Sequence, residues 1–376
     1  MSNYSFLIIM FNNKVIILGI FVLNTIAMFG PEMGTPKLNS LLKNAKSSGI
    51  SDHLNQDEIK LLNKMSGKNW TSGEPVDSLV GLNLEDEDYD SVGTNFSSSG
   101  FSQFNLPENF TSSDKWPMCK ESFERIVDQG NCGSCWSVSS ANTLSDRACI
   151  KSGKIKFFSY QDPLECCSYC GIGCRGGSTL AAFNWFFSSG VVSGGLYETN
   201  SSCKPYLYAP CHDSAYKNTI PCLAVVQNSS CKYSCTEEFN TNKCSEENTQ
   251  ENKNQCINNP LLIYFSDKQK PSYYYRIAKN ETLIMQEIYT NGPITAGFLV
   301  FSDFLTYKEG IYKYTTGRIL GGHAVKIIGW GIENGVKYWI CVNSWGPNWG
   351  ENGLFRIVRG INHLYIEQFL VTAIFN

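Results

Sequence analysis

Residues 129–136 read Gln-Gly-Asn-Cys-Gly-Ser-Cys-Trp, and this stretch decides the fold of the chain. Two short motifs far downstream complete it, Gly-His-Ala at 322–324 and Asn-Ser-Trp at 343–345. Together the motifs supply a thiol at Cys135, an imidazole and two side-chain amides. A thiol becomes a strong nucleophile only as the thiolate, and a nearby imidazolium or a helix N-terminus lowers its pKa. The motifs therefore predict nucleophilic chemistry at Cys135.

The composition is that of a globular protein with nearly balanced charge. The chain has 376 residues, of which 42% are hydrophobic and 17% charged, and its formal net charge is −3. This length is enough for one large or two medium domains with a real core. Because the charge is close to neutral, we expect no nucleic-acid partner and no membrane-surface partner. We also expect no cofactor and no metal.

All 16 cysteines lie between Cys119 and Cys341. Such density predicts an oxidising compartment and a disulfide framework. The alternative is a zinc site, because the spacing of Cys167, Cys170 and Cys174 is also typical of zinc ligands. The apolar N-terminus and the glycosylation sequons favour disulfides.

Residues 1–30 are typical of a signal peptide. Lys14 precedes an apolar run at residues 15–29, and small residues follow. An uncleaved membrane anchor is the alternative if residues 6–10 join the run. A signal peptide predicts the secretory pathway, with a lysosome, a vacuole or the cell exterior as the destination. Sequons for glycosylation after translocation begin at Asn69, Asn95, Asn109, Asn200, Asn228 and Asn280.

Residues 31–105 are polar and free of cysteine, a composition that does not fold alone. One helix is predicted here, with Asn55 as N-cap and Glu58 three residues later. Its apolar face would consist of Ile59, Leu61, Leu62 and Met65. An acidic run at residues 85–90 and a linker rich in Ser and Gly follow. The segment is therefore either a disordered spacer or an inhibitory pro-segment, with cleavage expected within residues 91–105.

Residues 106–376 form the main globular unit. Its first half predicts a helix at residues 136–150, which lack Gly and Pro. The second half predicts strands at 324–330, 337–342 and 354–358, where β-branched and aromatic residues alternate with Gly or Asn breaks. Helices followed by antiparallel strands indicate an α+β fold with two lobes.

The motif Cys-Gly-Ser-Cys-Trp with a distant His and Asn resembles the signature of papain-family cysteine peptidases. Residues 190–198, Gly-Val-Val-Ser-Gly-Gly-Leu-Tyr-Glu, and 203–206, Cys-Lys-Pro-Tyr, resemble the cathepsin B-like branch. The likeness covers residues 106–376 except a polar insertion at 236–271. It implies a helical left lobe, an antiparallel β right lobe and a cleft between them. A helix followed by Trp-x-x-Gly resembles the short cathepsin B propeptide, so it favours the pro-segment.

The resemblance assigns a role to each motif residue. Cys135 would be the nucleophile at the start of a helix, where the dipole favours a thiolate. His323 would be the base, and Asn343 would hold its ring. Gln129 would donate to the oxyanion, together with the Cys135 N–H. Trp345 would shield the His–Asn hydrogen bond from water. The alternatives are another disulfide cysteine at position 135 and a core histidine at 323.

Several further residues would contact substrate by the same resemblance. Gly176 and Gly177 would pair with an extended peptide backbone, or they form only a turn. Gly322 and Ala324 flank the histidine. Phe369 would close the S2 pocket with an apolar ring, so apolar or aromatic P2 residues are expected. Residues flanking Phe369 would be Ser178, Gly297 and Ala324.

The branch carries a disulfide-closed occluding loop, expected here within residues 203–235. In relatives two adjacent histidines of this loop bind the substrate carboxylate. This chain has Asp213 and Ser214 at those positions, and Thr219 replaces the arginine of a second loop contact. An anionic Asp213 would repel the substrate carboxylate rather than bind it. It would also face Asp128, which carries the same charge. We therefore expect endopeptidase activity to dominate dipeptidyl carboxypeptidase activity, unless His212 substitutes from one position away.

The resemblance also implies the disulfide pairing. The expected bridges are Cys119–Cys149, Cys132–Cys174, Cys166–Cys231, Cys167–Cys170, Cys203–Cys235 and Cys211–Cys222. Cys244 and Cys256 have no counterpart and would pair with each other. These bridges would leave Cys135 and Cys341 without a disulfide partner, and Cys341 is expected to be a buried, inert thiol.

The sequence thus predicts a secreted or lysosomal cysteine endopeptidase, made as a zymogen, that works through an acyl-enzyme. Expected partners are peptide or protein substrates, its own pro-segment and cystatin-type inhibitors, and the enzyme is expected to be a monomer. Acid would release the pro-segment by neutralising the acidic run at residues 85–90. Two rivals are a catalytically inactive binding protein on the same scaffold and a structural cysteine-rich module.

Overall fold

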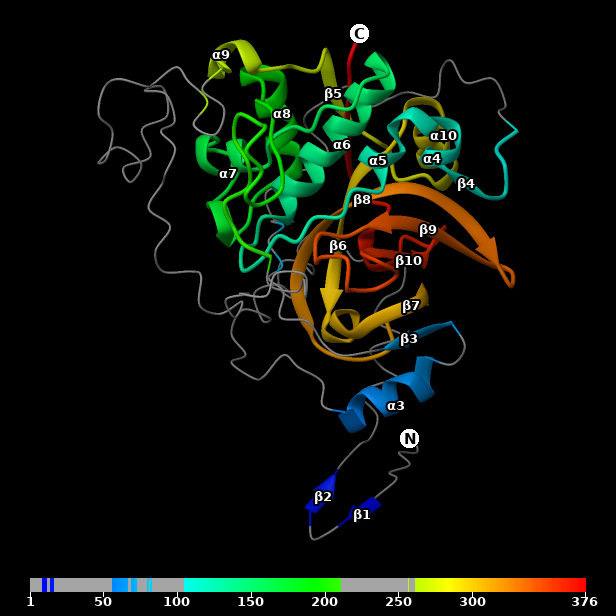
Figure 1. Ribbon diagram of the computed structural model, residues 1–376. Helices are drawn as coiled ribbons and strands as arrows, with labels where there is room; N and C mark the ends of the chain where they lie inside the picture. Colours follow the sequence, from blue (N-terminus) through cyan, green and yellow to red (C-terminus); the bar gives the residue numbers. More distant parts are fainter. Residues whose placement is uncertain are drawn as a thin grey trace.

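The computed structural model describes residues 9–11, 14–16, 56–66, 69–72, 80, 82, 105–210, 256 and 261–376. In Figure 1 most helices lie at the top and most strands of the large sheet lie below them, which is the predicted α+β architecture. Near the N-terminus, β1 (Ile9–Phe11) and β2 (Lys14–Ile16) form a short antiparallel pair. Among the described residues, no helix has the length and apolar character needed to span a bilayer.

The helical lobe is built around α6 (Cys135–Ser152), which is buried along almost its whole length. Its interior has neither Gly nor Pro, and it ends at Gly153, whose left-handed conformation lets its N–H bond to the Cys149 carbonyl. The predicted helix at 136–150 is therefore present. The remaining helices are α3 (Gln56–Ser66), α4 (Ser112–Lys115), α5 (Lys120–Phe123), α7 (Gln161–Cys166), α8 (Thr179–Ser189), α9 (Tyr264–Asp267) and α10 (Glu281–Asn291). Short 3-10 turns are η1 (Pro117–Cys119), η2 (Gly173–Arg175), η4 (Ser302–Thr306) and η5 (His363–Tyr365).

The second lobe is one sheet with the strand order β3-β7-β10-β9-β8-β6-β11-β5, and β4 pairs beside β8. These strands pair antiparallel, except that β10 and β7 are parallel. Their bounds are β3 (Trp70–Ser72), β4 (Phe110–Thr111), β5 (Tyr273–Arg276), β6 (Ile294–Phe301), β7 (Tyr307–Tyr312), β8 (Ile319–Glu333), β9 (Val336–Val342), β10 (Leu354–Val358) and β11 (Phe369–Ile374). The three predicted strands fall within β8, β9 and β10.

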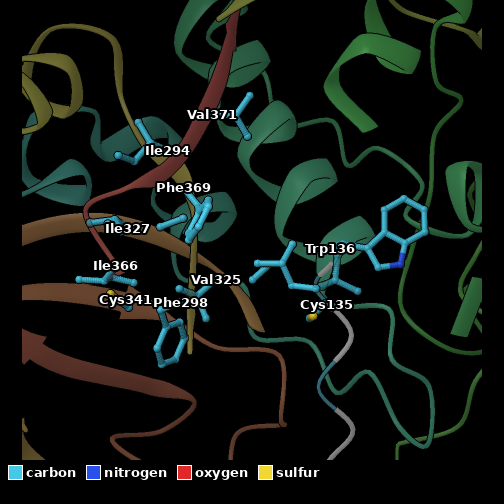
Figure 2. Packing of buried hydrophobic residues seen from close by; sticks show 14 of the residues in the cluster. Cys135, Trp136, Ile294, Phe298, Val325, Ile327, Cys341, Ile366, Phe369 and Val371 are labelled. Carbon is cyan, nitrogen blue, oxygen red and sulfur yellow. The ribbon is translucent and has the colours of Figure 1, made fainter. Parts of the chain in front are cut away.

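The two lobes meet where α6 packs against β8, β6 and β11. Figure 2 shows this contact, with Phe369 and Val371 of β11 lying beside the helix that begins at Cys135. Polar contacts add to the apolar packing. The Lys326 ammonium on β8 lies 2.8 Å from the Asp146 carboxylate on α6, and both side chains are fully buried. Breaking a buried pair of this kind costs about 3–5 kcal/mol, so the pair fixes the helix against the sheet.

Residues 56–72 of the polar N-terminal segment add a helix and a strand to the second lobe. The predicted helix is present as α3, but only Ile59 and Leu62 are buried, while Leu61 and Met65 are exposed. The predicted four-residue apolar face was therefore too wide, because α3 contacts its neighbours along a single stripe. Asn55, the expected N-cap, lies outside the described residues. After α3, β3 extends the sheet by pairing with β7.

Candidate active site

The first wall of the site is the turn that leads into α6. Cys135 is the first residue of the helix and is fully buried. The preceding turn is joined to the next loop by the Cys132–Cys174 disulfide. Gly177 in that loop lies so close to the Trp136 ring that a β-carbon there would approach it within 2.6 Å. Glycine at 177 therefore lets the loop backbone lie directly beside the start of α6.

The second wall is β8, which carries His323 with Gly322 before it and Ala324 after it. The imidazole is fully buried, and its Nε2 lies 2.7 Å from the Asn343 Oδ1. The same oxygen accepts the Ser344 N–H at 2.8 Å, so it acts as an acceptor and Nε2 carries the proton. This tautomer leaves a lone pair on Nδ1, which has no hydrogen-bond partner in the part of the chain that the structure describes.

Aromatic rings enclose the histidine. The Trp345 ring lies 4.8 Å from the imidazole between centroids, and the Phe298 ring lies 5.9 Å away. Burial lowers the pKa of His323 to about 4, although the hydrogen bond to Asn343 opposes this change. The imidazole is therefore neutral in this structure.

One residue of the polar N-terminal segment, Leu82, joins the two walls. The Leu82 N–H donates to the Gly322 carbonyl at 2.9 Å, and Leu82 also forms a parallel bridge to Gly177. Since paired strands lie about 4.8 Å apart, the two glycines are separated by about 10 Å. Leu82 fills the space between them and is itself buried. Sequence reasoning missed this residue, although an apolar Leu within a polar segment was a usable signal.

Gln129 links the turn before Cys135 to Ser344, the residue after Asn343. Its side-chain Nε2 donates to the Cys132 carbonyl at 2.8 Å, and its Oε1 accepts the Ser344 hydroxyl at 2.6 Å. Its backbone N–H donates to the Ser344 carbonyl at 2.8 Å. The amide is therefore held between the turn before Cys135 and the residue after Asn343. The arrangement combines a thiol at a helix start, an oriented imidazole and a fixed amide donor.

Comparison with known families gives this arrangement its context. The sequence profile described as papain family cysteine protease matches residues 106–374. The chain belongs to the papain family of cysteine proteases.

Its relatives place it in the cathepsin B-like branch. Cathepsin B-like cysteine proteinase 4 of Caenorhabditis elegans is 41% identical over 272 residues, which cover 72% of this chain and 75% of that protein. Cathepsin B-like cysteine proteinase 5 of the same organism is 39% identical over 322 residues, covering 82% and 86%. This chain is thus a cathepsin B-like cysteine protease.

Solved structures of precursor forms are also similar. Procathepsin B S9 from Trypanosoma congolense has a TM-score of 0.67 and 29% identity, covering 85% of this chain and 98% of that one. The proform of the ragweed cysteine protease Amb a 11 has a TM-score of 0.58 at 19% identity, covering 92% and 90%. The second likeness concerns the fold alone. The first likeness supports the description of this cathepsin B-like chain as a zymogen.

Three of the predicted S2 residues lie in one row across the sheet, whereas Ser178 is the N-cap of α8 (Thr179–Ser189). Phe369 on β11 pairs with Gly297 on β6, and Gly297 pairs with Ala324 on β8. Residues that pair directly across strands share a face, so the Phe369 ring lies on the same face as Ala324. Figure 2 shows this ring among the apolar side chains beside α6. The Tyr365 ring, which the sequence did not single out, lies 6.2 Å from it between centroids.

The disulfides of the cathepsin B-like protease agree with the prediction in part. The bridges Cys119–Cys149, Cys132–Cys174 and Cys167–Cys170 are present. The last two use all three candidate zinc ligands, so the zinc alternative was wrong. Cys341 is a buried thiol whose pKa is raised well above its ordinary value by burial, as expected of an inert cysteine.

Two predicted bridges were wrong. Cys203 pairs with Cys256, and not with Cys235, so the suggested Cys244–Cys256 bridge is excluded too. Cys256 packs with Cys203 and Val192, and its N–H donates to the Leu262 carbonyl at 3.0 Å. Cys256, within the polar insertion, therefore lies against the helical lobe. Spacing alone does not determine connectivity, so the sequence had no means of showing this.

The occluding-loop predictions fall on residues outside those described. They concern His212, Asp213, Ser214, Thr219 and the bridge Cys211–Cys222. The partner predicted for Cys166, Cys231, also lies there, as do Cys235 and Cys244. Asp128, the residue that the loop was expected to face, is buried, and its Oδ1 accepts the Gly130 N–H at 2.8 Å.

Proposed function

We propose that the processed protease cleaves peptide bonds through Cys135, His323, Asn343 and Gln129. The Cys135 thiolate attacks the scissile carbonyl carbon, and the electron pair moves to the carbonyl oxygen. That oxyanion accepts hydrogen bonds from the Gln129 side-chain amide and the Cys135 N–H. His323 then gives its Nδ1 proton to the leaving amine, so the acyl-enzyme forms as the C–N bond breaks. Water attacks the thioester in the second half, with His323 as the base.

The 2.7 Å contact between His323 and Asn343 carries this proposal. It fixes the ring through Nε2 and leaves Nδ1 as the atom that exchanges protons, which is the role a nucleophile's base requires. The enclosing Trp345 ring lowers the local dielectric and so strengthens that contact. Asn343→Ala is expected to lower kcat more than KM, because it releases the ring without touching substrate.

The pro-segment inhibits the enzyme by two effects. Leu82 occupies the space between Gly177 and Gly322, where a substrate backbone would pair. Burial also keeps His323 neutral, which disfavours the thiolate–imidazolium pair. Departure of Leu82 from Gly322, the residue before His323, is expected to open the site to water, which would raise the His323 pKa and favour the ion pair. Cys135 in the processed enzyme is therefore expected to react with iodoacetamide much faster near pH 6 than in the zymogen.

Endopeptidase activity is favoured over dipeptidyl carboxypeptidase activity. The support is chemical, because Asp213 and Ser214 replace the histidine pair that binds a terminal carboxylate in relatives. A carboxylate at 213 repels a substrate carboxylate. Two peptides that differ only in a free or amidated C-terminus test this. Strong preference for the free acid would show that His212 or another group substitutes.

Substrates with an apolar P2 residue are favoured. Phe369 supplies an apolar ring in register with Gly297 and Ala324, on the face of the sheet that carries Ala324, the residue after His323. A cationic P2 side chain finds no carboxylate at position 369. A peptide series with Phe, Val or Arg at P2 tests this, and higher kcat/KM for Arg would contradict it.

The competing function is an inactive binding protein on the same scaffold. Labelling of the processed chain with an epoxide-type thiol inhibitor distinguishes the two. The protease requires labelling of wild type and its loss in Cys135→Ala, with hydrolysis lost in parallel. Wild type that neither labels nor hydrolyses peptides would favour the binding protein. A secretory destination, lysosomal or extracellular, suits a disulfide-bonded protease of this family.

A further inference from the structure

The Tyr206 hydroxyl lies between two atoms of the loop that precedes the nucleophile. This oxyanion loop comprises residues 129–134. The Tyr206 Oη donates to the Gln129 carbonyl at 2.8 Å and lies 2.6 Å from the Ser134 Oγ. Since a carbonyl oxygen only accepts, the Tyr206 proton points to Gln129 and the Ser134 hydroxyl donates to Tyr206. Both ends of the oxyanion loop are thus joined through one buried oxygen atom.

The Tyr206 side chain is well suited to this task. Burial raises the pKa of the phenol well above its ordinary value, so it remains a donor throughout the working pH range. The ring itself is held edge-on by Tyr160, with centroids 5.0 Å apart. A rigid ring places its hydroxyl with little loss of conformational entropy.

Tyr206 belongs to a firmly anchored segment, which we call the strap, residues 203–209. The Cys203–Cys256 disulfide fixes its first residue. The Lys204 ammonium is buried and lies 3.1 Å from both the Asp162 and the Glu165 carboxylates. The Tyr206 N–H donates to the Gly195 carbonyl at 3.1 Å. The strap is therefore attached to the helical lobe independently of the oxyanion loop.

The strap also touches the loop at a third point. Gly130 has φ = +60°, and a β-carbon there would lie 2.4 Å from the Ala209 carbonyl oxygen. The backbone of the strap thus packs directly on the residue after Gln129. Contacts at Gln129, Gly130 and Ser134 span almost the whole loop.

We propose that Tyr206 is a positioning residue that holds the two oxyanion donors, the Gln129 side-chain amide and the Cys135 N–H, in their mutual geometry. It acts on the first through the Gln129 backbone and on the second through Ser134, the residue before Cys135. The inference rests on the proposed function. Oxyanion donors act only at a defined distance, and removal of one costs about 10²–10³ in turnover. A displacement of about 1 Å is enough for a large part of that loss.

Tyr206→Phe tests the inference because it removes the hydroxyl and keeps the ring. We expect kcat to fall by about tenfold or more, with KM within about twofold of wild type. Titration of active enzyme with an epoxide-type inhibitor normalises for folded protein. Alkylation of Cys135 by iodoacetamide, which needs no oxyanion, is expected to change by less than about threefold. Tyr208→Phe is the matched control, since its ring packs on Tyr206 at 5.4 Å, and it is expected to retain wild-type kcat.

A double-mutant cycle with Gln129→Ala shows whether Tyr206 acts through the oxyanion donors. If it does, Tyr206→Phe lowers kcat much less in the Gln129→Ala background than in wild type. Equal losses in both backgrounds, an unchanged kcat in the single variant, or a parallel loss of alkylation and turnover would each overturn the inference. Failure of the proposed function looks different, because wild type itself would then show no hydrolysis that depends on Cys135.

Discussion

The Leu82 N–H donates to the Gly322 carbonyl at 2.9 Å, so the pro-segment makes a strand-like contact with the residue before His323. The same residue bridges Gly177 on the opposite wall. A single position of the pro-segment thus closes the site from both sides. Four consequences of the structure are open to direct measurement.

Leu82→Pro is expected to loosen the closed site. Proline has no N–H and so removes the bond to Gly322, which contributes about 0.5–1.5 kcal/mol. Alkylation of Cys135 by iodoacetamide in the uncleaved chain is expected to accelerate about threefold to tenfold. Leu82→Ala, which keeps the N–H, separates the contribution of the side chain. An unchanged alkylation rate in the proline variant would mean that Leu82 does not limit access.

Trp70→Ala is expected to weaken the pro-segment as an inhibitor. The indole is buried against Tyr312 and Tyr307, with centroids 5.1 and 6.2 Å away, and its Nε1–H donates to the Lys313 carbonyl. Loss of a buried Trp costs about 3–5 kcal/mol, so Ki for an added pro-segment peptide should rise more than about 100-fold. Leu61→Ala, at an exposed position on α3, serves as the control and should change Ki less than about twofold.

Asp303 gives the fold a pH dependence. It is fully buried, and burial raises its pKa from 3.8 to about 6, although hydrogen bonds from Thr315, Tyr312 and Thr316 oppose the rise. The folded chain binds this proton more tightly than the unfolded chain. The contribution of Asp303 to the free energy of unfolding is therefore fully present below pH 3.8. It falls by about 3 kcal/mol as the pH rises through about 6.

Asp303→Asn is expected to remove that dependence. Relative to wild type, the variant should gain stability between pH 4 and pH 7, as measured by denaturant unfolding at each pH. Its absolute stability at pH 4 reports the altered hydrogen bonds separately. A constant difference between variant and wild type across this range would contradict the assignment.

Removal of the Cys203–Cys256 bridge is expected to affect both stability and turnover. The bridge spans 53 residues, and loss of a native disulfide costs about 2–5 kcal/mol. The double variant Cys203→Ser/Cys256→Ser should therefore unfold at lower temperature and, because the strap carries Tyr206, should lose kcat as well. Thermal unfolding and steady-state kinetics measure the two effects. Leu261→Ala, a strongly exposed position beside the bridge, is the control for local surface change.

The sequence predicted the parts of the fold whose residues carry short-range signals. The stretch without Gly or Pro after Cys135 became α6, and the β-branched runs became β8, β9 and β10. The motif residues at 129, 323 and 343 lie together, linked through Asn343 and Ser344. Local patterns were sufficient there because each motif lies in a short stretch whose hydrogen bonds link it to the next motif.

Other features depend on contacts that no local pattern encodes. The pairing of Cys203 with Cys256 arises because the insertion returns to the helical lobe. Leu364 and Tyr365 have φ of 52° and 70°, a region that costs a bulky residue about 1–2 kcal/mol, yet both contribute to the core beside Phe369. Tertiary packing holds them there, and sequence rules place Gly or Asn at such positions. The apolar face of α3 was predicted too wide for a similar reason. The sequence does not show how many other elements pack against this helix, and only Ile59 and Leu62 are buried.

The pairing of β3 with β7 has a consequence for the protein after activation. While the precursor is intact, β7 has neighbours on both sides, β3 and β10. Departure of the pro-segment turns β7 into an edge strand whose backbone N–H and C=O groups on one side have no partner strand. Other protein chains can pair with such an edge. The charged, solvent-facing Lys308 and Glu309 on that strand discourage such adhesion. Maturation thus exposes β7 as an unpaired outer strand that only its charged residues protect. Aggregation of the mature enzyme would begin at this strand.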